Sequence, residues 1–117
     1  MRVTPSTRLD RFFSDLYRRR ALRTSSKNTL RLYDIALRMF DRFLGRRSVM
    51  RDLNSDTVSD FATWRGDQGV TSTTVTRDLA SILAMWRWAH REGYVKKWPD
   101  VQVAQRPRRT PVAWLEE

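Results

Sequence analysis

The stretch from Gly69 to Gly93 constrains the fold of this chain more than any other. Thr71 suits the start of a helix, because its hydroxyl can accept a hydrogen bond from a backbone N–H that has no helical partner. Apolar residues then recur at helical spacing and share one face: Val75, Leu79, Ile82, Leu83, Trp86 and Ala89. Gly93 suits the left-handed position that follows a helix. The pattern predicts one long amphipathic helix that ends near Glu92.

Three further helices are predicted by the same reasoning. The first runs from Pro5 to Leu22. The second begins at Ser26 and stops at Gly45. The third runs from Ser55 to Gln68, with Ser55 or Asn54 as its cap. The apolar stripe of the second helix comprises Leu30, Tyr33, Leu37, Phe40 and Leu44, and that of the third comprises Val58, Phe61 and Ala62. Strand-like alternation is nearly absent, so the chain is expected to be all-α, a compact bundle of four main helices.

The end of the chain reads differently from the rest. Pro107 and Pro111 flank an arginine cluster, which is typical of an extended segment. We therefore expect a helical domain over residues 1–98 and a linker over residues 99–117.

The second and fourth predicted helices open in the same way. One begins with Ser26, Lys27, Asn28 and Thr29, followed by Arg31; the other begins with Thr71, Ser72, Thr73 and Thr74, followed by Arg77. Free N–H groups and the positive end of the helix dipole attract anions, phosphate in particular. Ordinary capping would produce the same residues without a ligand.

Charge is the strongest global signal. The net charge is +10, from 23 Lys and Arg against 13 Asp and Glu, and residues 1–50 hold 13 of the cations but 4 of the acids. Arginine predominates, which favours phosphate because its planar fork meets two oxygens at once. A solvated face and contact with phosphate explain the cations of the first helix equally well. These cations are Arg8, Arg11, Arg18, Arg19, Arg20 and Arg23. By contrast Asp56, Asp60 and Asp67 make the third helix acidic, so it should point away from a polyanion.

Catalytic and metal chemistry is not expected in this chain. It has 0 Cys and 1 His, no glycine-rich phosphate loop, and carboxylates scattered over predicted outer faces. His90 is expected to be a packed, hydrogen-bonded core residue, and Trp88 to be wedged against another helix or the tail. We therefore expect no enzymatic activity, no cofactor, no metal and no small-molecule substrate. No apolar run is long enough for a membrane span.

Several motifs together resemble one family. They are Ser26-x-x-Thr29-x-x-x-Tyr33-x-x-x-Leu37-x-x-Phe40, then Asp52-Leu53, then Gly69-Val70-Thr71-x-x-Thr74-x-x-Arg77-x-Leu79, then Trp88-Ala89-x-x-x-Gly93-Tyr94. The chain resembles the N-terminal core-binding domain of tyrosine recombinases of the phage-integrase type, which has a SAM-like helical fold. Its ending, from Arg106-Pro107 to Glu116-Glu117, is similar to the linker into that family's catalytic domain. One departure is Pro99, which follows Trp98 where the family often has Asn-Pro.

The resemblance implies a function. The domain would clamp duplex DNA with its second and fourth helices in the major groove. The DNA-contacting residues would then be Ser26, Lys27, Asn28, Thr29, Arg31, Thr71, Ser72, Thr73, Thr74 and Arg77, with Arg106, Arg108 and Arg109 following the backbone. The family's catalytic Arg, Lys, His and Tyr would belong to the following domain, and Tyr17, Tyr33 and Tyr94 match none of them.

Partners and alternatives follow from the same features. The resemblance implies double-stranded DNA and other recombinase protomers as partners, no membrane, and a cytoplasmic protein associated with the nucleoid. The alternative is a basic helical module that binds an acidic protein or a membrane surface. A helix-turn-helix regulator fits less well, since no short turn joins two helices in that pattern.

Overall fold

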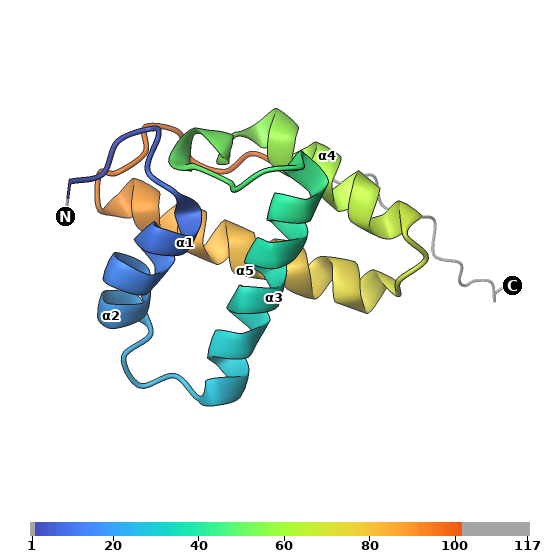
Figure 1. Ribbon diagram of the computed structural model, residues 1–117, viewed down its shortest axis with the longest axis horizontal. Coiled ribbons are helices and arrows are strands. Elements are labelled where there is room, and N and C mark those ends of the chain that lie inside the picture. The colour runs from blue at the N-terminus through green and yellow to red at the C-terminus, as the bar shows by residue number, and fades with distance from the viewer. Residues whose placement is uncertain (1, 102–117) are drawn as a thin grey trace, which may run out of the picture.

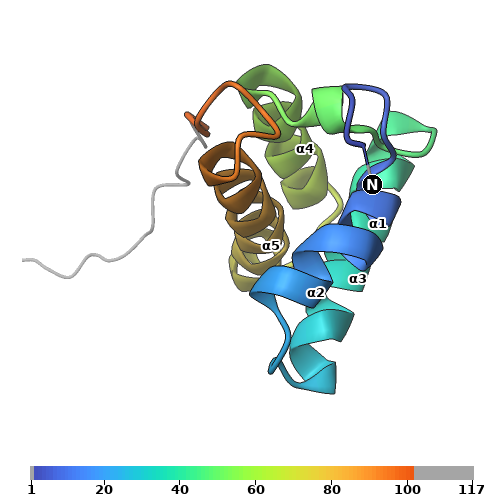
Figure 2. The same ribbon diagram turned by 90° about the vertical axis from the view of Figure 1, so that its left-hand side faces the viewer.

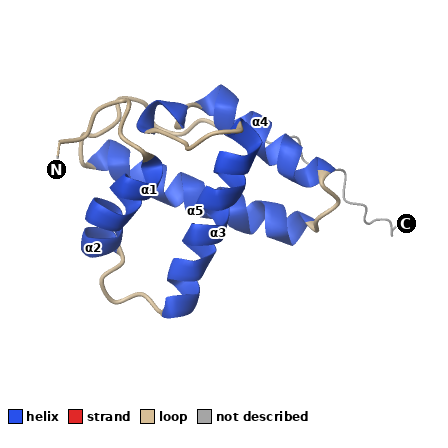
Figure 3. Ribbon diagram, in the orientation of Figure 1, coloured by secondary structure: helices blue, strands red, loops and turns tan. Residues whose placement is uncertain are grey.

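The computed structural model describes residues 2–101 of the chain (Figure 1). Its elements are α1 (Leu9–Phe12), η1 (Phe13–Tyr17), α2 (Arg18–Ala21), α3 (Lys27–Leu44), η2 (Met50–Asp52), α4 (Ser55–Asp67) and α5 (Ser72–Arg91). The first three follow one another without a break and make one helical rod, so the described part contains four main helices and no strand (Figure 3). The all-α expectation is confirmed.

The helices form two layers around one core. The rod α1–η1–α2 lies beside α3, and α4 lies beside α5 in the second layer (Figure 2). Helix α3 crosses α5 and packs against it more extensively than any other pair of elements (Figure 1). The fully buried large side chains are Trp86, Phe12, Phe40, Phe61, Leu9, Ile82, Met85 and Val58. All four helices therefore contribute to one hydrophobic core.

The predicted helix ends are confirmed by local capping. Gly45 has a φ of 72° and Gly93 a φ of 85°, both in the left-handed region that residues with a Cβ rarely adopt. Asn54 caps α4 by accepting from the N–H of Thr57 at 2.9 Å. Leu30, which the stripe pattern placed in the core, is half-buried and lies outside the core cluster.

The predicted start of the first helix at Pro5 is wrong. The helix begins at Leu9, because the preceding backbone pairs with the connector after α3. The Leu9 N–H donates to the carbonyl of Ser48, while the N–H groups of Met50 and Arg51 donate to the carbonyls of Thr7 and Pro5. The carbonyls of Pro5 and Thr7, which a helix would need, are thus occupied by another segment.

Two other expectations need correction. Asp52 and Asp78 are buried, although all carboxylates were expected on outer faces. His90 packs edge-on against Trp98, with ring centroids 5.3 Å apart, yet its Nδ1 has no hydrogen-bond partner among residues 2–101. Trp88 is wedged as expected, against Phe12 and Tyr17 of the first rod.

Residues 94–101 fold back over the end of α5. The Trp86 Nε1–H donates to the carbonyl of Lys97 at 2.9 Å, and Val101 packs against the core cluster. The predicted arginines of the tail, Arg106, Arg108 and Arg109, lie outside the described residues, as does most of the predicted linker.

Candidate nucleic-acid interface

The N-terminal end of α3, residues 26–31, has the predicted capping geometry and is called the α3 end below. Ser26 is the N-cap, and its Oγ accepts from the N–H of Thr29 at 3.2 Å. The Thr29 hydroxyl lies 3.2 Å from the same oxygen, so it is engaged in the cap. Lys27, Asn28 and Arg31 are exposed. The α3 end therefore presents two cations and an amide beside free backbone N–H groups.

The N-terminal end of α5, residues 71–77, repeats this geometry and is called the α5 end. The Thr71 Oγ1 accepts from the N–H of Thr74 at 3.2 Å, and the two hydroxyl oxygens lie 3.0 Å apart. Ser72, Thr73 and Arg77 are exposed. Both caps have the same arrangement, with one hydroxyl at the N-cap and a second hydroxyl three residues later. The two ends therefore offer an anion equivalent backbone N–H groups at the positive end of a helix dipole.

The structure does not bring these two ends together. Helix α3 begins at the bottom of Figure 1 and α5 begins at its right-hand side, and the two helices cross between these points. Each N-terminal half projects beyond the crossing as a separate arm. A ligand that touched both ends would have to be extended, as a nucleic-acid duplex is.

A buried ion pair fixes the direction of the α5 arm. The Arg65 Nε donates to the Asp78 carboxylate at 2.7 Å, and its Nη1 donates to the Gln68 Oε1 at 2.9 Å. The Arg65 side chain is 12% exposed and that of Asp78 is 5% exposed. The pair joins the last turn of α4 to the first half of α5, so it holds the α5 end in place.

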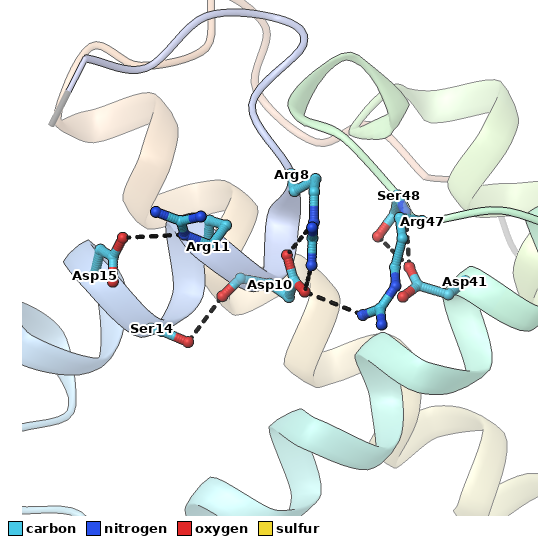
Figure 4. Close-up of polar contacts among 8 residues, drawn as sticks. All are labelled: Arg8, Asp10, Arg11, Ser14, Asp15, Asp41, Arg47 and Ser48. Atoms are coloured by element: carbon cyan, nitrogen blue, oxygen red, sulfur yellow. Dashed lines mark hydrogen bonds and ion pairs between the residues drawn. The ribbon is translucent and has the colours of Figure 1, made fainter.

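Most of the other paired cations gather where α1 meets the connector after α3 (Figure 4), whereas Arg38 pairs with Asp34 on α3. Asp10 binds Arg8 at 2.6 Å and Arg47 at 3.1 Å, and Arg11 reaches Asp15. The Arg8 hydrogen bond, assisted by Arg47, holds the pKa of the Asp10 carboxyl below its usual range. Arg8, Arg11 and Arg47 on this part of the surface are therefore paired with acids.

Asp52 organises the adjacent turn. Arg46 donates two hydrogen bonds to its carboxylate, at 2.7 and 2.8 Å, and the Val49 N–H donates a third at 2.8 Å. Burial opposes ionisation of this carboxyl, yet the hydrogen bonds from Arg46 and Val49 prevail, and the pKa of Asp52 lies below its usual range. Asp52 therefore acts as a structural anion and no catalytic role follows from it.

The lower part of the molecule in Figure 1 carries a different charge pattern. Residues 16–33 hold six cations and no carboxylate: Arg18, Arg19, Arg20, Arg23, Lys27 and Arg31. Within residues 2–101, none of these six forms an ion pair, and neither do Arg77, Arg87 and Arg91 of α5. Positive charge thus accumulates without compensation around the α2–α3 loop and along α5.

Sequence reasoning found both helix ends but missed this partition. The signal was available, since the gap in acidic residues from 16 to 33 can be read directly from the chain. The pairing of Arg46, Arg47 and Arg65 was not readable, because their partners come from other elements.

Comparison with known proteins places this sequence in a family. Residues 9–93 match the model of the phage integrase N-terminal SAM-like domain. The chain belongs to this family. The matched residues include every helix from α1 to α5, and the resemblance drawn from the motifs is thereby confirmed. This SAM-like domain is the N-terminal domain of tyrosine recombinases of the integrase type.

One curated relative supports the assignment. The chain is 28% identical over 96 residues to the tyrosine recombinase XerD of Pseudomonas aeruginosa. The aligned region covers 81% of this chain and 31% of that protein. The chain therefore spans about a third of the length of this relative. No solved structure matches the chain significantly.

The helices were also compared with the length and hydropathy that a bilayer requires. None in the described part of the SAM-like domain is both long and apolar enough to cross a membrane.

Proposed function

We propose that this SAM-like domain binds double-stranded DNA for a site-specific tyrosine recombinase and that the α3 end and the α5 end both contact the duplex. The observation that supports this proposal is that some cations form ion pairs with acids and others do not. Arg8, Arg11, Arg46 and Arg47 near α1 and the connector are paired with acids, whereas the cations at the two helix ends have no acidic partner within residues 2–101. Backbone N–H groups and the hydroxyls of Ser72 and Thr73 would hold phosphates, and Asn28, Arg31 or Arg77 would reach base edges.

The arrangement favours DNA over a membrane surface. A helix that lies on a membrane needs large apolar side chains exposed opposite its cations. In the described residues the one exposed large hydrophobic side chain is Trp98, at 47%, and it lies after α5 on the returning segment. An acidic protein partner is the remaining alternative, and salt titration with matched ligands separates it from DNA.

Other parts of the proposal concern the whole recombinase. The domain would act beside other protomers on DNA, in the cytoplasm and at the nucleoid. We also propose that this chain does not cleave DNA itself, since no residue of it matches the family's catalytic set. Supercoiled plasmid should remain unnicked after incubation with the chain. A covalent tyrosine–DNA adduct would overturn this part.

The central test is duplex binding as a function of salt. The dissociation constant for an arbitrary duplex should be on the order of 10⁻⁴–10⁻⁶ M at physiological salt, because one domain without its catalytic partner contacts mainly phosphates. The logarithm of the binding constant should fall linearly with the logarithm of salt concentration. A flat plot, or equal affinity for polyglutamate and DNA, would contradict the proposal.

A further inference from the structure

An open groove lies between α2 and the C-terminal half of α5. It is lined by Tyr17, Ala21, Ala84, Arg87, Trp88 and Arg91, and its volume is about 510 Å³. We call it the α2/α5 groove. Its floor is firmly packed, because Trp88 contacts Phe12, Tyr17 and Tyr94 with ring centroids 5.4–6.0 Å apart. The two arginines are exposed above this floor.

A local departure from α-helical geometry shapes the groove. Residues Phe13–Tyr17 form a π-helical turn, in which the N–H of Arg18 donates to the carbonyl of Phe13. Such turns are rare and occur often at functional sites. Here the turn joins Tyr17 to Tyr33, whose hydroxyl oxygens lie 2.8 Å apart. Burial and the hydrogen bond to Tyr33 raise the pKa of Tyr17, so its phenol stays neutral and the arginines alone set the charge of the groove.

No acid offsets that charge. Arg87 and Arg91 form no ion pair within residues 2–101, and residues 79–91 contain no Asp or Glu. The opposite wall comes from α2, whose Arg18, Arg19 and Arg20 are exposed in the same turn as Ala21. Glu92 follows Arg91 directly and is exposed, but it pairs with neither arginine. The groove is therefore a concentrated source of positive potential.

We propose that the α2/α5 groove binds the sugar-phosphate backbone of the DNA, with Arg87 and Arg91 each contacting a phosphate. This inference rests on the proposed function and adds a third contact to it. The cations are all arginine, whose fork matches two phosphate oxygens. Arg87 and Arg91 are four residues apart, so they lie on one helix face about 6 Å apart along the axis and reach the same strand.

Position along the chain favours DNA over an acidic peptide as the occupant. The wall that contains Ala21 leads within five residues to Ser26, the cap of the α3 end. Arg23 lies between Ala21 and Ser26 in the chain and is exposed, as are Arg18, Arg19 and Arg20 just before Ala21. The groove thus extends the positive surface around the α2–α3 loop.

The test compares two double variants with the same loss of charge. Arg87→Ala/Arg91→Ala removes the groove cations, and Arg38→Ala/Arg42→Ala removes two exposed arginines at the same spacing on α3, of which Arg38 also pairs with Asp34. Binding of the 117-residue chain to a duplex is titrated at several salt concentrations. The groove variant should weaken binding at least about tenfold and lower the salt slope by about 1.8, the value for two lost phosphate contacts. The α3 variant should change the slope by less than about 0.5, since it loses no phosphate contact.

A third variant tests the groove without removing either arginine. Ala21→Glu places a carboxylate on the opposite wall and leaves both arginines in place, and it should also weaken binding. Circular dichroism and urea unfolding check each fold. Equal slopes for the two double variants would overturn the inference, as would a groove variant that loses stability but keeps its slope. If the groove variant lost binding to polyglutamate and kept binding to DNA, the groove would be an acidic-peptide site.

Failure of this inference is distinguishable from failure of the proposed function. If the wild-type chain shows no salt-dependent DNA binding, the proposed function fails. If Lys27→Glu and Arg77→Glu weaken DNA binding while the groove variant does not, only the third contact fails.

Discussion

At the scale of single residues, the arginines of this domain fall into two groups that their sequence neighbours do not distinguish. Arg65 lies in the last turn of α4, and Arg77 lies in the first half of α5. The Arg65 side chain is only 12% exposed and pairs with Asp78, whereas Arg77 is exposed. The first holds two helices together, and the second is available to a ligand. The difference arises from the packing of α4 on α5.

Asp78→Ala should lower the free energy of unfolding by about 3 kcal/mol or more, because it leaves the buried Arg65 without its ionic partner. Asp78→Asn keeps a hydrogen-bond acceptor and should cost less. Urea unfolding at neutral pH measures both, with exposed Asp60→Ala as the control, expected to change stability by about 0.5 kcal/mol or less. A loss below about 1 kcal/mol for Asp78→Ala would mean that the pair does not couple α4 to α5.

At the scale of elements, the two capped helix ends and the acidic face of α4 predict opposite responses to charge reversal. Arg77→Glu and Lys27→Glu should each weaken duplex binding strongly, because they reverse charge where phosphates are proposed to sit. Asp60→Lys changes charge by the same two units on α4 but should have little effect, since it would lie more than a Debye length of about 8 Å from the duplex. All three residues are exposed, so circular dichroism should show an unchanged fold.

The measurement is the dissociation constant of each variant at one fixed salt concentration. If overall charge alone governed binding, Asp60→Lys would strengthen it as much as Arg77→Glu weakens it. That result would refute contact through the helix ends and leave a generic basic protein.

At the scale of the whole molecule, two carboxylates predict the response to acid: Asp10 ties α1 to the connector, and Asp52 orders the connector itself. The pKa values of Asp10 and Asp52 are lowered in the folded state, so the stability these groups contribute is complete above about pH 5, beyond the unfolded value near 3.9. It is lost as the pH falls through the lowered folded values. The domain should therefore unfold at lower urea concentration at pH 3 than at pH 7.

Asp52→Asn isolates one of these groups. The variant and the wild type should differ more in unfolding midpoint at pH 7 than at pH 3, because the stability from the ionised carboxyl begins to be lost below its unfolded pKa near 3.9. Asp60→Asn serves as the exposed control. A difference that stayed constant across this range would show that ionisation of Asp52 does not stabilise the fold.

The sequence by itself determined the features that depend on neighbouring residues. Caps at Ser26, Asn54 and Thr71 and the left-handed Gly45 and Gly93 are local hydrogen-bonding and backbone preferences, so the helix boundaries they set could be predicted. The apolar stripes likewise predicted which faces are buried. These signals gave the all-α fold, the family and the two helix ends of the candidate site.

Only the tertiary structure decided the features that depend on residues far apart in the chain. The first helix starts at Leu9 because Pro5 and Thr7 accept hydrogen bonds from Met50 and Arg51, some forty residues away. Asp78 is buried because Arg65 on another helix neutralises it. The α2/α5 groove exists because α2 packs beside the end of α5. Each requires a partner that no local pattern identifies, since its hydrogen bond, charge or surface is met only after the chain has folded.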